Sequence, residues 1–384
     1  MSTNVMFIRN TFFAILVIVI NTVKAADNNY KLELVQMMYR HGDRAPEVLY
    51  PTDPNPASVW PLGLGSLTWQ GKREHYSLGK LFREMYRGFL TTKPTEVDAV
   101  STDVDRCLES AEANFASFFA PTPEWKFEND LNWQPIPITS IPMALDKFLG
   151  STYCPAFQRE VNRQLNTPSN KEFNAKHKEL YKYLTIQTQA YVTEYLTAHE
   201  LYDILFIEKK YNLKIPSWVP PIFDELTDVA VNTYPLIYNS TAIQRLRAGP
   251  VLGLMNEVFN VKVNNQAPEL KFRTYSTHDG NIAAVLGALN NLRPEIIHYC
   301  ATIIFEMYSG SGGNYFIRIL YLNTPYEDKS NQTPRVLILP GCEEYCPYEK
   351  YLKYTSTYAH IDYDGECNLD SNEEEDIKDS LDVS

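Results

Sequence analysis

The chain has few basic residues for its length. Among 384 residues, 35 lysines and arginines stand against 47 aspartates and glutamates, so the formal net charge is −12 at pH 7. A protein that binds nucleic acid needs a basic footprint for the phosphate backbone, which argues against nucleic acid as a partner. Part of the acidic excess lies in residues 368–384, which we expect to form a solvated, disordered tail.

Long apolar runs are also missing after the N-terminus, and the acidic C-terminus cannot serve as a lipid-anchor signal. Near the start, Arg9 precedes nine apolar residues at 12–20, and Val23-Lys24-Ala25 follows as a small-residue cleavage pattern. A membrane-spanning helix needs about 20 apolar residues. We therefore expect a signal peptide at 1–25 rather than an anchor, and a mature protein without a membrane span that is secreted or delivered to the lysosomal lumen.

Cysteine is scarce, and spacing alone does not define the disulfides. Six cysteines allow 15 complete pairings. Cys342 and Cys346 are close enough for a tight local loop. Cys107 falls in a helical pattern and Cys300 in a strand pattern, where a buried free thiol is as reasonable as a bridge.

Two glycosylation sequons agree with a secreted protein. They begin at Asn239 and Asn331. Pro334, directly after the second sequon, makes Asn331 the weaker acceptor.

From residue 31 the chain alternates strand-like and helix-like runs, the pattern of an α/β domain. Each of three strands is followed by a helix in this interpretation, with strands at 32–38, 99–101 and 271–275 and helices at 71–90, after STDVD and at 281–289. Thr102 or Asp103 is expected to cap the second helix, which places Arg106 in its first turn.

The middle of the chain has a different texture, with proline-rich connections around long, tyrosine-rich helical patterns. We interpret residues 121–244 as a mostly α-helical cap, and residues 26–120 and 245–367 as the α/β core. A predicted hairpin, at 301–308 and 314–322, adds antiparallel strands and makes the sheet mixed.

Three loops after predicted strands contain RHGDRAP, STDVDR and THDG. Ligands of open α/β sheets bind outside the carboxyl ends of the strands. If these strands are parallel neighbours, one crevice collects Arg40, His41, Arg44, Arg106, His278 and Asp279.

Such a crevice is strongly positive within an acidic protein. Arginine suits phosphate because its planar fork donates two parallel hydrogen bonds and stays charged. The ordinary alternative is that these arginines only form ion pairs with surface carboxylates such as Asp43. Within the site, we expect Asp43 to hold Arg40 and Arg44 in place. Gly42 is expected to permit a sharp turn close to the ligand. No HExxH, clustered cysteine ligands or EF-hand loop is present, so no metal is expected.

Three further histidines are expected to have no catalytic role. His75 lies in a predicted core helix, and His177 and His199 lie in the predicted cap. We expect packing or surface roles for all three.

The motifs LVQMMYRHGDRAP, STDVDR, NWQPIP, THDG and LPGCEEYCP together resemble the histidine acid phosphatases, the family that includes prostatic, lysosomal and insect venom acid phosphatases. The resemblance implies a phosphoglycerate-mutase-like mixed α/β core with a helical cap, and neither cofactor nor metal. It implies that His41 is the nucleophile that forms a phosphohistidine and that Asp279 is the proton donor. The expected phosphate ligands are Arg40, Arg44, Arg106 and His278.

The same resemblance implies the disulfides Cys154–Cys367 and Cys342–Cys346. The partner that the family usually provides for a cysteine at the position of Cys300 is not found in the matching cap region, and Cys107 is also a departure.

The chemistry can be followed from the residues as well. A neutral imidazole that attacks phosphorus divides hydrolysis into two transfers, and arginines neutralise the charge on the phosphoryl oxygens in both. Nearby arginines are expected to lower the pKa of His41, and also that of Asp279 unless bound phosphate raises it again. An acidic rate optimum follows, because a general acid must carry its proton.

The predicted partner is a small phosphomonoester, and a homodimer is compatible with the sequence. Two alternatives stay open at this point. One is a phytase or lipid phosphatase on the same core, and the other is a non-catalytic secreted glycoprotein.

Overall fold

The computed structural model describes residues 30–150, 154–359 and 362–367. The predicted signal peptide at 1–25 and the predicted tail at 368–384 lie outside the described residues. Within the described ranges, no helix combines the length and the apolar character needed to cross a membrane.

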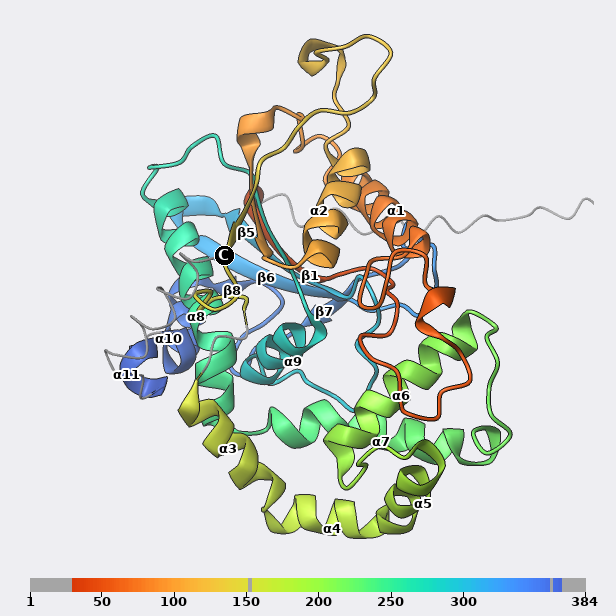
Figure 1. Cartoon of the computed structure of the whole chain (residues 1–384). Coiled ribbons are helices and arrows are strands. Elements are labelled where there is room, and N and C mark those ends of the chain that lie inside the picture. The colour runs from red at the N-terminus through yellow and green to blue at the C-terminus, as the bar shows by residue number, and fades with distance from the viewer. Residues whose placement is uncertain (1–29, 151–153, 360–361, 368–384) are drawn as a thin grey trace, which may run out of the picture.

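An eight-stranded mixed sheet forms the centre of the molecule (Figure 1), as predicted. The order along the sheet is β3-β2-β4-β1-β5-β6-β7, and β8 also pairs with β6. The strands are β1 (Lys31–Arg40), β2 (Val97–Thr102), β3 (Ile138–Ile141), β4 (Phe272–Thr277), β5 (Thr302–Ser309), β6 (Tyr315–Leu322), β7 (Arg335–Leu337) and β8 (Cys346–Pro347). Pairing is parallel from β3 to β1 and antiparallel from β1 to β7, so the predicted hairpin of β5 and β6 is confirmed.

Strand β1 is buried on both faces from Leu34 onward. Its alternating side chains enter two different cores: Leu34 and Met38 belong to one, whereas Val35 and Met37 belong to the other. Because successive side chains point to opposite faces of a strand, a strand with a core on each face has a nearly continuous run of apolar residues in its sequence.

Helices cover the two faces of the sheet separately (Figure 1). Helices α1 (Trp69–Met85) and α2 (Asp105–Phe118) pack on one face, and α8 (Thr241–Val263), α9 (Asp279–Ala288) and α10 (Tyr348–Ala359) pack on the other. The predicted cap of α2 was wrong, because its N-cap is Val104 and no side chain caps it. Arg106 does lie in the first turn of α2, as predicted.

A group of helices curves past one end of the sheet (Figure 1). It contains α3 (Pro155–Leu165), α4 (Pro168–Lys176), α5 (Lys178–Thr188), α6 (Tyr195–Lys210) and α7 (Phe223–Ile237). The range 121–244 that we interpret as the cap also contains β3, which pairs with β2 as an edge strand of the sheet. The domain boundaries themselves stay a prediction.

Both disulfides implied by the family resemblance are present. Cys154–Cys367 joins the start of α3 to α11 (Tyr363–Cys367) across a separation of 213 residues, and Cys342–Cys346 closes a local loop. Cys107 and Cys300 are free and buried. Cys300 was predicted within a strand, but it precedes β5 and has a positive φ of 63°.

Candidate active site

Strand β4 lies between β1 and β2 and pairs with both in parallel. The three motif loops therefore all follow the carboxyl ends of these strands on the same side of the sheet, as predicted from their order. Arg40 ends β1, His278 is the N-cap of α9, and Asp279 is the first residue of that helix. The helix was predicted to begin two residues later, so Asp279 is held by helical backbone rather than by a loop.

His41 directly follows the carboxyl end of β1 and is 2% exposed. Its Nδ1 atom is 2.8 Å from the carbonyl oxygen of Gly42, which can only accept a hydrogen bond. Nδ1 therefore carries the proton, and Nε2 is left with a free lone pair. The ring of His278 lies nearby, with 5.4 Å between the two ring centroids.

The pKa of His41 lies well below its ordinary value. Burial is the largest cause, the charge of Arg40 follows, and Arg106 and Arg44 act in the same direction. The direction agrees with the expectation from sequence, although that expectation named the arginines and not burial as the main cause. His41 is therefore neutral in mildly acidic solution.

Arg40 is held from several sides. Its Nη2 atom is 2.7 Å from Oδ2 of Asp279, its Nη1 donates to the carbonyl oxygen of Ile297, and its guanidinium carbon lies 4.4 Å from the ring centroid of Tyr299. The charges of Arg40 and Arg44 lower the pKa of Asp279 below its usual range, although burial opposes them. Asp279 is thus ionised in the free protein.

The other two arginines are also held by carboxylates. Nη1 of Arg44 is 2.9 Å from Oδ2 of Asp203, a residue of α6. Arg106 reaches Oε1 of Glu47 at 2.7 Å, and Arg44 approaches the same oxygen at 3.7 Å. Neither Asp203 nor Glu47 belongs to a motif that marked the site in the sequence.

All three arginines keep an unused hydrogen-bond donor. The Nε atoms of Arg40, Arg44 and Arg106 are buried and have no hydrogen-bond partner among the described residues. Buried N–H groups in native proteins are nearly always paired. The three arginines near His41 thus each have an Nε donor without a hydrogen bond, although that of Arg44 lies 3.7 Å from Oε1 of Glu47.

His278 faces a thiol. Sγ of Cys107 lies 3.6 Å from Nε2 of His278, and burial raises the pKa of this thiol to about 12, so it keeps its proton. Burial, together with Arg106, lowers the pKa of His278 to about 3. Both groups are therefore uncharged in mildly acidic solution.

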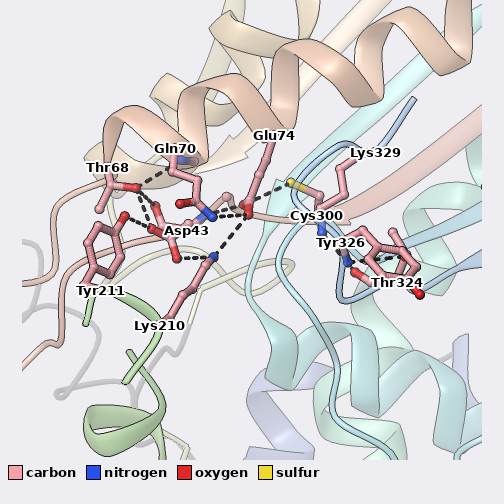
Figure 2. A network of polar contacts seen from close by, with 12 residues as sticks. Asp43, Thr68, Gln70, Glu74, Lys210, Tyr211, Cys300, Thr324, Tyr326 and Lys329 are labelled. Carbon is pink, nitrogen blue, oxygen red and sulfur yellow. Dashed lines mark hydrogen bonds and ion pairs between the residues drawn. The ribbon is translucent and has the colours of Figure 1, made fainter. Parts of the chain in front are cut away.

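Asp43 does not hold the arginines, which corrects our expectation. Figure 2 shows its carboxylate accepting from Nζ of Lys210 at 2.7 Å, from Oγ1 of Thr68 at 2.6 Å and from the hydroxyl of Tyr211. Glu74 of α1 accepts from the backbone N–H of Asp43 at 2.9 Å and from Lys210 at 3.3 Å. This network ties the loop after His41 to α1 and to the end of α6.

Gly42 is needed for a close approach between segments. A Cβ atom there would lie 2.5 Å from the carbonyl oxygen of Gly71 in α1, and its φ is not positive. The expected sharp turn toward a ligand is therefore not the reason for glycine. His75 fills a packing role, as predicted: it is fully buried, and its Nε2 is 3.1 Å from the carbonyl oxygen of Arg40.

A cavity of about 430 Å³ opens beside Arg40 and Asp279. Helices α6 and α7 line its other side, and among their residues is His199, which faces the ring of Tyr234 at 5.3 Å. His199 lies in the helical group, as predicted, and its packing or surface role stays a prediction. His177 instead contacts Glu225 at 2.9 Å and does not line this cavity.

The chain thus combines a mixed α/β sheet, helices that line a cavity beside the strand ends, and a buried neutral histidine near three arginines. The chain belongs to the histidine phosphatase superfamily (branch 2), whose family model matches residues 31–322. The predicted family, the fold class and the prediction of an acid phosphatase are therefore confirmed.

Curated relatives cover most of the chain. Human lysosomal acid phosphatase is 32% identical over 349 residues, which are 88% of this chain and 81% of the relative. Venom acid phosphatase Acph-1 of Apis mellifera is 34% identical and covers 84% of each chain, and human prostatic acid phosphatase is 32% identical and covers 92% of each chain.

Solved structures share the fold at low sequence identity. The phytase of Citrobacter braakii matches with a TM-score of 0.67 and 16% identity, over 88% of this chain and all of the phytase. The apo phytase of Hafnia alvei matches with a TM-score of 0.65 and 16% identity, over 89% of this chain and 99% of the phytase. At this identity the likeness concerns the fold alone.

Proposed function

We propose that this protein is a secreted acid phosphatase that hydrolyses phosphate monoesters through a covalent phosphohistidine at His41. One observation carries the proposal: a neutral imidazole with its Nε2 lone pair free lies among three arginines with unpaired buried donors. The names of the relatives, lysosomal, venom and prostatic acid phosphatase, support the same activity.

The substrate's phosphoryl group would be bound by Arg40, Arg44, Arg106 and His278. Hydrogen bonds between guanidinium and phosphate are charge-assisted, and the transferring group spreads its negative charge over its equatorial oxygens. The unpaired Nε donors are available for these oxygens. The three guanidinium groups would neutralise the phosphoryl charge, so neither a metal nor an organic cofactor would be needed for that purpose.

In the first step, Nε2 of His41 attacks phosphorus and the bond to the ester oxygen breaks. Asp279 would donate a proton to the departing alcohol. Asp279 is ionised in the free protein, so it gains this proton when bound phosphate offsets the charges of Arg40 and Arg44.

In the second step, water attacks the phosphohistidine. The carboxylate of Asp279, which has lost its proton to the alcohol, would take a proton from this water. The N–P bond breaks, inorganic phosphate leaves, and His41 returns to its neutral state with Nδ1 still bound to Gly42.

The compartment is part of the proposal. Cleavage after Ala25 would release the protein outside the cell or into the lysosomal lumen, and relatives named lysosomal, prostatic and venom enzymes support this class of compartment. Asn239 and Asn331, the predicted glycan acceptors, are both exposed. Formation of a homodimer stays a prediction.

The test is hydrolysis of a chromogenic aryl phosphate at about pH 5 by the intact protein and by His41→Ala and His41→Asn. We expect turnover by the wild type and a loss of at least about 1,000-fold in both variants, because each lacks the nucleophile. Equal thermal midpoints would show that the variants are folded. Turnover by a folded His41→Ala at the wild-type rate would refute the nucleophile.

A further inference from the structure

Tyr299 is a buried residue with an unused hydroxyl on the wall of the cavity. The residue is 6% exposed and lines the cavity together with Arg40 and Asp279. Its hydroxyl has no hydrogen-bond partner among the described residues. A buried hydroxyl that has given up water without gaining a partner is costly, so it calls for an explanation.

The ring of Tyr299 is in contact with the proposed catalytic residues. Its centroid lies 4.4 Å from the guanidinium carbon of Arg40, 5.9 Å from the ring centroid of His41 and 5.2 Å from Nζ of Lys210. Cations over the face of an aromatic ring are attracted by its quadrupole. The ring therefore helps to orient Arg40, but this contact does not involve the hydroxyl.

The backbone on both sides of Tyr299 is bound to the same two residues. The carbonyl oxygen of Ile297 accepts from Arg40, and the N–H of Cys300 donates to the carbonyl oxygen of His41 at 3.2 Å. Cys300 adopts a φ of 63°, a conformation that non-glycine residues rarely take and that occurs at functional sites. The position of Tyr299 is thus coupled directly to the nucleophile.

The hydroxyl keeps its proton and so remains a donor. Burial, followed by the charge of Asp203, raises the pKa of Tyr299 well above its ordinary value, and Arg44 and Arg40 oppose this only in part. Arg40, which contacts the Tyr299 ring, and Arg44 are both among the residues proposed to bind phosphate. An anion bound by these arginines at the cavity wall would offer the hydroxyl an acceptor.

We propose that the hydroxyl of Tyr299 donates a hydrogen bond to an oxygen of the substrate's phosphoryl group. This inference rests on the proposed phosphatase function and adds a catalytic residue that no sequence motif marked. Because the contact is to the phosphoryl group, it applies to phosphate monoesters in general and to inorganic phosphate. The alternative is that the chain uses only the aromatic ring, as packing beneath Arg40.

The variant Tyr299→Phe distinguishes a role of the hydroxyl from a role of the ring alone, because it removes the hydroxyl and keeps the ring. At about pH 5 we expect the inhibition constant of inorganic phosphate to rise, and kcat/KM for an aryl phosphate to fall, by about tenfold each, the ratio for one hydrogen bond to a charged group. The thermal midpoint should be unchanged or higher, since the lost hydroxyl has no partner within the protein.

Tyr351→Phe is the matched control. Tyr351 of α10 is fully buried, and its hydroxyl is also without a partner among the described residues, but it does not line the cavity. Its removal should leave both constants at wild-type values. This comparison isolates the effect of position from the effect of deleting a buried hydroxyl.

The inference is overturned if a folded Tyr299→Phe keeps both constants within twofold of the wild type. It is also overturned if Tyr299→Phe fails to fold, because the hydroxyl would then have a structural role. Failure of the phosphatase function itself is distinguishable: the wild type would then neither hydrolyse the ester nor be stabilised against heat by inorganic phosphate.

Discussion

At the scale of single residues, the site is a set of arginines that already have carboxylate partners. Arg40 is paired with Asp279, Arg44 with Asp203, and Arg106 with Glu47. These pairs fix the guanidinium groups before substrate arrives, and such preorganisation lowers the cost of binding. In the proposed function, the Nε atoms, which have no hydrogen-bond partner among the described residues, would donate to the ligand.

The proposed role of Asp279 predicts a dependence on the leaving group. In Asp279→Asn, hydrolysis of an alkyl phosphate should fall by about 100-fold or more, whereas an aryl phosphate with an acidic phenol should lose much less, because a good leaving group needs no proton. The measurement is kcat for a series of esters with leaving alcohols of different pKa. Equal losses for all of them would exclude Asp279 as the general acid.

The pKa shifts predict an acidic rate optimum. The lowered pKa of His41 keeps it neutral in acid, so its protonation does not limit the rate until strongly acidic pH. Asp279 has a lowered pKa in the free protein, so its proton must arrive with the substrate, and a phosphate monoester loses its second proton at about pH 6. The rate should therefore fall as pH rises above about 6. A maximum at about pH 9 in a pH profile of kcat/KM would contradict this account.

The six residues predicted for the site were identifiable because each belongs to a short motif at a strand end. Asp203, Glu47 and Tyr299 could not be found in this way, since each acts through a contact that depends on the tertiary fold. The expectation for Asp43 failed for the same reason. Its cationic partner, Lys210, is 167 residues away, at the end of α6.

At the scale of elements, α6 is the main polar link between the helical group and the site. Asp203, in the middle of α6, forms an ion pair with Arg44. Lys210, at the end of α6, forms ion pairs with Asp43 and Glu74 (Figure 2). Both carboxylates bound by Lys210 are buried, whereas Lys210 itself is 19% exposed. The loop that carries His41 is therefore positioned partly by this helix.

Lys210→Met should weaken both stability and turnover. It leaves two buried carboxylates without their cation, and we expect a loss of about 2 kcal/mol in the free energy of unfolding, below the usual cost of a fully buried pair because Lys210 has some access to water. Thermal unfolding and kcat would be measured. Lys182→Met, which removes an exposed partner of Glu179, is the control and should change neither. Equal effects of the two substitutions would argue against the link.

Elements with a strong pattern were predictable and short ones were not. The hairpin of β5 and β6 has long apolar runs around a glycine-rich turn, and both strands were found. Strand β3 has four residues within a proline-rich stretch and no buried face, and it was not predicted. The cap of α2 failed because Val104, with no polar side chain, occupies the position that sequence rules reserve for residues such as Thr102.

At the scale of the whole molecule, one disulfide joins distant parts of the chain. Cys154–Cys367 spans 213 residues and ties α11 to the first helix of the helical group, whereas Cys342–Cys346 spans four. A crosslink restricts the unfolded chain more strongly when it closes a longer loop.

The double variant Cys154→Ser with Cys367→Ser should therefore be the less stable of two matched variants. We expect its free energy of unfolding to fall by about 2–5 kcal/mol, and that of the double variant at Cys342 and Cys346 to fall by less. Thermal unfolding without reductant gives the comparison. A larger loss for the local pair would show that loop closure does not determine the order.

The central claim is the covalent intermediate at His41, and direct detection of the phosphoenzyme tests it. The protein would be mixed rapidly with a labelled phosphomonoester at about pH 5, quenched in alkali, which preserves phosphohistidine, and mapped by proteolysis and mass spectrometry. Phosphate should be found on His41 in the wild type and on no residue in His41→Ala. Turnover without a phosphorylated His41, or with the label on His278, would contradict the account.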